Sequence, residues 1–328
     1  MDTKLLSKYR TQILGIAIVW CLAFHSGYQF SSSILNAILF YGWVSVDIFL
    51  FLSGVGIYFS LQKESSSKLF YMKRFLRIYP SFIIAVIVYS VYKNFSLPET
   101  ILNILTVNYW INSPYQFNWF MSGLIVLYAI SPWYYKLFKR SPGIVTVIGV
   151  VLVLLIVAVT PLHVFYVTTR IPIFLIGFYF GYLILEKKLS EAENRRNIWI
   201  MFFAFVIGLV CFYYVRTNLW GLVPQLRTLC IIFIAPFLSL AIAQVLSIFK
   251  NYKYPFLSFL GKYSLILYLF YDMIADYLIR IDKVLYKIVD ISIYPQWVSE
   301  ITVFVIGCSF AYLFQNMMDK VTDKMKPK

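Results

Sequence analysis

The stretch Leu14–Ser26, LGIAIVWCLAFHS, predicts an apolar helix whose outer half carries one titratable side chain, His25. An imidazole inside a bilayer is costly, so a histidine at such a position is a candidate functional group. The alternative interpretation is a histidine that only packs or hydrogen-bonds between helices. This stretch is the first of many long apolar runs, and those runs decide the fold class.

The composition is typical of a membrane protein rather than a soluble one. The chain has 328 residues, of which 61% are hydrophobic and 13% are charged, and its mean hydropathy is +0.77. The net charge of +15 does not indicate a nucleic-acid partner, because the basic residues lie between apolar runs and not on one soluble face. The expected partner of the chain is the lipid bilayer.

A helix that crosses a bilayer needs ~20 apolar residues, and ten segments of the chain are candidates. The candidate spans are residues 12–30, 38–61, 78–94, 118–137, 142–160, 166–185, 197–215, 226–248, 258–278 and 295–315. We therefore expect an all-α, polytopic bundle of about ten transmembrane helices. Residues 1–328 form a single transmembrane domain in this interpretation, since no loop is long enough to fold as a separate soluble domain.

The basic residues predict the orientation of these spans. If the N-terminus is cytoplasmic, most of the 29 Lys and Arg residues fall in segments on the cytoplasmic side. Cytoplasmic loops of membrane proteins are enriched in Lys and Arg, so this bias predicts that both termini are cytoplasmic. We expect a multi-pass protein of the cell membrane, as in a bacterial plasma membrane.

The cysteines do not indicate a metal site. All four (Cys21, Cys211, Cys230 and Cys308) lie in apolar runs, and none has a partner at the spacing of metal ligands. Buried cysteines of this kind usually behave as small apolar side chains. The sequence does not indicate an oligomeric state.

A carboxylate lies at a similar predicted depth to His25. Asp47 occurs early in the second span, in GWVSVDIFLFLSG, and that span runs in the opposite direction. A carboxylate beside an imidazole orients the ring and stabilises its protonated form. We therefore predict His25 and Asp47 as catalytic residues. The alternative is a carboxylate that only occupies the start of a helix near the outer surface.

A basic cluster precedes the third span. The stretch Phe70–Pro80, FYMKRFLRIYP, places Lys73, Arg74 and Arg77 at the predicted cytoplasmic edge of the membrane. Positive side chains near a helix N-terminus suit the phosphates of a nucleotide-like donor such as coenzyme A. The alternative is the ordinary anchoring of basic residues to lipid headgroups.

A third group of residues is predicted to bind the substrate. Arg170 lies near the outer end of the sixth span, where it can hold a substrate oxygen or a carboxylate such as Asp47. Asn118 and Trp119 begin the fourth span and can provide a polar and aromatic lining for a sugar. The alternatives are an arginine that extends to the membrane surface and residues that serve only helix packing.

Four stretches, taken in order, resemble the membrane acyltransferase-3 family, whose members act on glycans of the cell envelope and other extracellular glycans. LGIAIVWCLAFHS is similar to the histidine motif of the first helix, and GWVSVDIFLFLSGVGIYFS to the family's GVDIFFFLSG segment. FYMKRFLRIYP is similar to F-x-x-RR-x-x-RI-x-P, and FLGKYSLILYLF to a late GKYSLEIYL segment. The resemblance extends from about residue 5 to 315.

This resemblance implies the transfer of an acyl group, usually acetyl, from cytosolic acetyl-CoA to a sugar hydroxyl at the outer face. It also implies that His25 is the catalytic histidine and that Lys73, Arg74 and Arg77 bind the donor. It implies ten spans, in agreement with the charge distribution. Separately, we expect no metal cofactor.

The chain departs from the family pattern at two positions. Leu14 stands where the family usually has an arginine, and Arg10, one turn earlier on the same helical face, is the candidate replacement. In the late motif, Ile266 and Tyr271 stand where the family often has a glutamate and a histidine, which puts a second acid–base group in doubt.

Two rival functions remain open at this point. The size of the bundle and its intramembrane charges also suit a transporter or flippase for an envelope lipid or saccharide, although no inverted repeat supports it. The absence of the family's usual arginine and histidine, replaced here by Leu14 and Tyr271, also suits a non-catalytic homologue.

Overall fold

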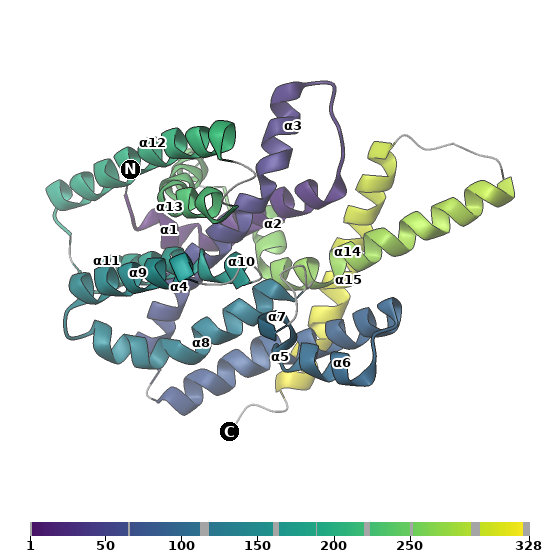
Figure 1. Cartoon of the computed structure of the whole chain (residues 1–328), viewed down its shortest axis with the longest axis horizontal. Helices are drawn as coiled ribbons and strands as arrows, with labels where there is room; N and C mark the ends of the chain where they lie inside the picture. The colour runs from purple at the N-terminus through teal and green to yellow at the C-terminus, as the bar shows by residue number, and fades with distance from the viewer. Residues whose placement is uncertain are drawn as a thin grey trace. The chain divides into compact units, whose positions relative to one another are not determined.

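The computed structural model describes residues 2–64, 66–111, 118–159, 164–187, 189–219, 224–249, 252–289 and 296–323, with side chains except at 224 and 277–297. Its regular elements in these ranges are all helices (Figure 1). The all-α prediction is confirmed.

Each of the ten predicted spans coincides with a long helix. The helices are α2 (Arg10–Ser26), α4 (Ser45–Lys63), α5 (Ser67–Lys93), α8 (Trp119–Phe138), α9 (Pro142–Val159), α11 (Ile171–Leu185), α12 (Glu191–Asn218), α13 (Pro224–Ile248), α14 (Pro255–Val289) and α15 (Gln296–Asp323). Short helices connect or extend them: α1 (Leu5–Lys8), α3 (Ser33–Phe40), η1 (Tyr41–Val44), α6 (Leu97–Ile104), α7 (Asn108–Ile111) and α10 (Phe165–Thr168).

Eight helical segments in the described part of the chain are long and apolar enough to cross a membrane. The two long helices outside this set are α2, which has 17 residues, and α8, whose second half contains a proline and several Tyr and Trp residues. The chain is therefore a multi-pass membrane protein. That α2 and α8 also cross the bilayer, and that both termini are cytoplasmic, stay predictions.

The contacts between helices form two compact units that alternate along the chain. Unit 1 contains Met1–Arg10, Val46–Arg74 and Ser96–Tyr252, and unit 2 contains Thr11–Ser45, Phe75–Phe95 and Lys253–Lys328. Residues far apart in sequence meet in each unit. The assignment of all 328 residues to one domain stays a prediction.

In unit 1, helices α4 and α11 approach each other through glycines. A Cβ atom on Gly177 would lie 2.0 Å from the carbonyl oxygen of Phe51, and one on Gly54 would lie 2.2 Å from the carbonyl oxygen of Phe174. Only glycine permits such backbone contact, which is the usual way in which membrane helices pack closely. Gly181 meets Tyr58 further along, so the two helices begin at the same end.

In unit 2, helices α2 and α14 cross through a second pair of glycines. A Cβ atom on Gly15 would lie 2.2 Å from the carbonyl oxygen of Leu257, and one on Gly261 would lie 1.8 Å from that of Thr11. The Gln12 side chain donates to the Ser258 hydroxyl over 3.0 Å beside this crossing. The crossing fixes the register of the two helices, and α15 packs along α14.

Candidate active site

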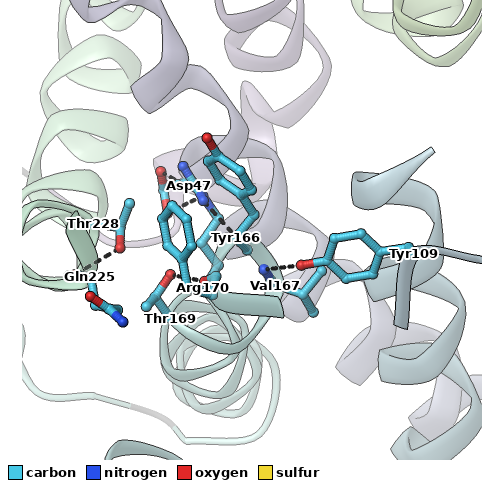
Figure 2. A network of polar contacts seen from close by, with 9 residues as sticks. Asp47, Tyr109, Tyr166, Val167, Thr169, Arg170, Gln225 and Thr228 are labelled. Carbon is cyan, nitrogen blue, oxygen red and sulfur yellow. Dashed lines mark hydrogen bonds and ion pairs between the residues drawn. The ribbon is translucent and has the colours of Figure 1, made fainter. Parts of the chain in front are cut away.

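A buried ion pair joins the starts of α4 and α11 in unit 1 (Figure 2). Asp47 lies in the first turn of α4, where a carboxylate interacts favourably with the helix dipole. Arg170 is the residue immediately before α11. Its Nε lies 3.3 Å from each carboxylate oxygen of Asp47, and both side chains are buried. Of the two partners predicted for Arg170, the structure shows the carboxylate.

Two further groups hold the Arg170 guanidinium. One of its terminal nitrogens donates to the carbonyl oxygen of Tyr166 over 2.9 Å, and the ring of Trp119 lies 5.1 Å from its central carbon. Aromatic faces attract cations, especially where water is excluded. The predicted substrate residues Arg170 and Trp119 are thus neighbours.

The predicted substrate residue Asn118 belongs to a buried cluster of amides. It stands at the start of α8, but its side chain does not cap that helix. Instead its amide nitrogen donates to the Asn103 side-chain oxygen over 3.1 Å, and Asn108 donates to the same oxygen over 3.0 Å. The cluster fixes the start of α8 and therefore the position of Trp119. Sequence reasoning missed Asn103 and Asn108, although two polar amides inside an apolar segment are a usable signal.

Tyr109 connects this region to the segment before Arg170. Its hydroxyl accepts a hydrogen bond from the backbone nitrogen of Val167 over 3.3 Å (Figure 2). Burial raises the pKa of the Tyr109 phenol, so it stays neutral. Tyr109 and Val167 also form an apolar core against which Trp119 packs.

The predicted donor residues lie on α5 in three different environments. The Lys73 ammonium is 2.7 and 2.9 Å from the two carboxylate oxygens of Glu64, with side chains 52% and 9% exposed. The Arg74 guanidinium lies near the rings of Phe70 and Tyr128, 5.6 and 5.8 Å from their centres. Arg77, which belongs to unit 2, is exposed.

Arg10, the candidate replacement for the family arginine, binds the backbone of α4. Its Nε donates to the carbonyl oxygen of Leu52 over 3.1 Å, and its guanidinium covers Gly56. Because Gly56 has no side chain, the planar group lies directly on the helix surface. This contact anchors the start of α2 within unit 1, and a catalytic role for Arg10 stays a prediction.

His25 lies at the end of α2 in unit 2. Its Nδ1 is 3.4 Å from a carboxylate oxygen of Asp272 on α14, and the two side chains are 42% and 63% exposed. The Phe24 ring packs against the imidazole in a T-shaped arrangement, with the ring centres 5.3 Å apart. The carboxylate that unit 2 provides to His25 is therefore Asp272. Asp47 belongs to unit 1, and its predicted pairing with His25 stays a prediction.

A second carboxylate follows one turn after Asp272 on α14. Asp276 accepts a hydrogen bond from the Tyr92 hydroxyl and lies 3.5 Å from the Lys93 ammonium. Tyr271, where the family often has a histidine, is buried, and Gly307 lies against its ring. Unit 2 thus provides an imidazole, two carboxylates and an ammonium group on three helices.

A comparison with known protein families assigns the chain to one of them. The family described as an acyltransferase domain, acyltransferase-3, matches residues 13–315, which is nearly the whole chain. No curated protein and no solved structure matches the chain. The matched range contains the buried ion pair, the basic residues of α5 and the His25–Asp272 pair. The chain therefore belongs to the acyltransferase-3 family and is a membrane acyltransferase.

Proposed function

We propose that the protein transfers an acyl group, most simply acetyl, from cytosolic acyl-CoA to a sugar hydroxyl of a cell-surface glycan. The family match supports acyl transfer. The observation that supports the site is the half-exposed imidazole of His25, which follows an apolar stretch near the end of α2 and faces a carboxylate. An imidazole that is accessible within a membrane bundle is suited to take a proton from a hydroxyl group.

His25 acts as a general base and then as a general acid in this proposal. Its unprotonated nitrogen takes the proton of the acceptor hydroxyl while the hydroxyl oxygen attacks the thioester carbonyl carbon. The carbon–sulfur bond breaks, and the leaving thiolate takes the proton from the imidazolium. The products are the acyl ester and free coenzyme A, so atoms and charges balance.

The basic residues of α5 bind the donor in this proposal. Lys73 is half-exposed and Arg77 is exposed. The Lys73 ammonium and the Arg77 guanidinium are therefore accessible to phosphate oxygens. Arg74 lies near two aromatic rings, an environment that also suits an adenine ring stacked nearby. The enrichment of basic residues on the predicted cytoplasmic side supports a cytosolic donor.

The buried pair of Asp47 and Arg170 serves the acceptor side. Asp47 holds the guanidinium in place, while Trp119 covers it and is itself positioned by the Asn118 amide cluster. The partly exposed Trp119 ring is suited to stack on the apolar face of a sugar, and the buried Arg170 guanidinium holds that ring in place.

The proposal is tested with purified protein in liposomes that receive acetyl-CoA on one side and an envelope glycan extract on the other. Release of coenzyme A is followed for wild type, His25→Ala and His163→Ala. General-base catalysis contributes at least ~100-fold, so we expect His25→Ala to lose that factor and His163→Ala, the other of two histidines, to keep its rate.

Two results would contradict the proposal. If glycan or lipid crosses the liposome membrane without acetyl-CoA, the protein is a transporter or flippase. If wild type binds no acetyl-CoA and releases no coenzyme A in the presence of the extract, it is a non-catalytic homologue.

A further inference from the structure

We propose that Asp272 is the positioning residue of His25: it accepts a hydrogen bond from Nδ1–H and so leaves Nε2 as the nitrogen that takes the proton. The role in acyl transfer rests on the proposed function, whereas the geometry stands independently of it. Neither the family motifs nor the spacing in the sequence pointed to Asp272.

The register of α2 and α14 brings the two side chains together. The helices cross where Gly15 and Gly261 allow backbone contact. His25 follows the crossing by ten residues and Asp272 by eleven, which places both ~15 Å beyond it along helices that run in the same direction. Since a glycine pair fixes the crossing of α2 and α14, the fold of unit 2 itself places His25 beside Asp272.

The chemistry of the contact selects one tautomer of the imidazole. A neutral histidine has one N–H donor and one acceptor nitrogen, and the hydrogen bond at one nitrogen decides which form is present. A carboxylate can only accept, so Asp272 favours the form with hydrogen on Nδ1. The separation of 3.4 Å is longer than a usual hydrogen bond, as is common in catalytic sites without bound substrate.

The same carboxylate stabilises the imidazolium that forms after proton transfer. When Nε2 takes the proton of the acceptor hydroxyl, the ring becomes a cation beside the Asp272 anion, and the proton later leaves from Nε2 to the coenzyme A thiolate. Cys21 on α2 and Tyr89 on α5 lie within electrostatic range of Asp272. A neutral thiol or phenol carries no negative charge, so neither group stabilises the imidazolium as the Asp272 carboxylate does.

Asp276 is a matched control within the same helix. It lies one turn from Asp272, carries the same charge and is held by Tyr92 and Lys93. Replacing either aspartate with asparagine removes one negative charge from the same face of α14. Only the replacement of Asp272 removes the partner of His25, so the two variants separate a specific contact from a general change of charge.

The first test reads the tautomer of His25 directly. The chain contains two histidines, so protein labelled with ¹⁵N-histidine gives two sets of ring signals, and His163→Ala assigns them. We expect wild type and Asp276→Ala to carry hydrogen on Nδ1 of His25, and Asp272→Ala to lose this preference. An unchanged His25 spectrum in Asp272→Ala, or equal changes in both aspartate variants, would overturn the inference.

The second test separates this inference from the proposed function. In the liposome assay we expect Asp272→Asn to lower kcat by roughly 100-fold while the KM for acetyl-CoA stays the same, and Asp272→Glu to recover part of the loss. If His25→Ala is inactive but Asp272→Asn keeps its kcat, the inference fails and the proposed function survives. If wild type transfers no acyl group and the tautomer still depends on Asp272, the proposed function fails and the inference survives.

Discussion

Replacement of Asp47 with asparagine tests the buried ion pair of unit 1. The substitution keeps the shape of the side chain but leaves the buried Arg170 guanidinium without its counter-charge. Breaking a buried pair in this way costs ~3–5 kcal/mol of unfolding free energy. Because Arg170 keeps the Tyr166 carbonyl and the Trp119 ring, we expect a loss near the lower end of this range, ~3 kcal/mol.

The assay is reversible unfolding of the purified protein in mixed micelles with increasing denaturing detergent. Lys73→Gln is the matched control, because it breaks a pair whose lysine is 52% exposed and should cost ~1 kcal/mol or less. The double variant Asp47→Asn/Arg170→Met should cost less than the sum of its single variants by roughly 2 kcal/mol. Two results would refute the reasoning. One is a loss of unfolding free energy in Asp47→Asn that is smaller than the loss in Lys73→Gln. The other is a double variant whose loss equals the sum of the losses of its two single variants.

Three further predictions concern the donor site, the close contact of α4 and α11, and the amide cluster. Glu64→Gln should lower the KM for acetyl-CoA roughly two- to fivefold, because it releases Lys73 from an ion pair worth ~1 kcal/mol or less; an unchanged KM in steady-state kinetics argues against Lys73 as a donor ligand. Gly177→Ala should abolish the folded yield measured by size-exclusion chromatography, since its Cβ would lie 2.0 Å from a carbonyl oxygen, while Gly143→Ala, with nothing within 4 Å, should behave as wild type. Asn103→Ala should cost ~1–3 kcal/mol in the unfolding assay because it leaves buried amides unpaired, and a neutral result would show that the cluster does not hold α8.

Hydropathy alone predicted the positions of the long helices, because burial in a bilayer imposes the same apolar requirement on every span. The ends were less predictable. Helix α5 begins at Ser67, eleven residues before its predicted span, and α12 begins at Glu191 behind a capping box formed by Ser190 and Glu193. Hydropathy marks the part of a helix that lies in lipid, whereas caps and charged turns extend it into water.

The partners of the functional side chains were less predictable than the helices. Asp47 and Arg170 are 123 residues apart, and they meet because Gly54 and Gly177 let α4 and α11 approach closely. The sequence identified both residues and offered Asp47 as one of two possible partners of Arg170, but it could not choose between them. The similar predicted depths of His25 and Asp47 suggested a pair, and this pairing stays a prediction because the two residues belong to different units.

The most direct test of the account follows the acyl group itself. Liposomes containing wild type or His25→Ala receive acetyl-CoA labelled in the acetyl carbon, and the glycan acceptor is recovered and treated with mild base. The account predicts one base-labile acetyl ester on the glycan for each coenzyme A released by wild type, and neither product from His25→Ala. Equal labelling of the glycan by His25→Ala would contradict it.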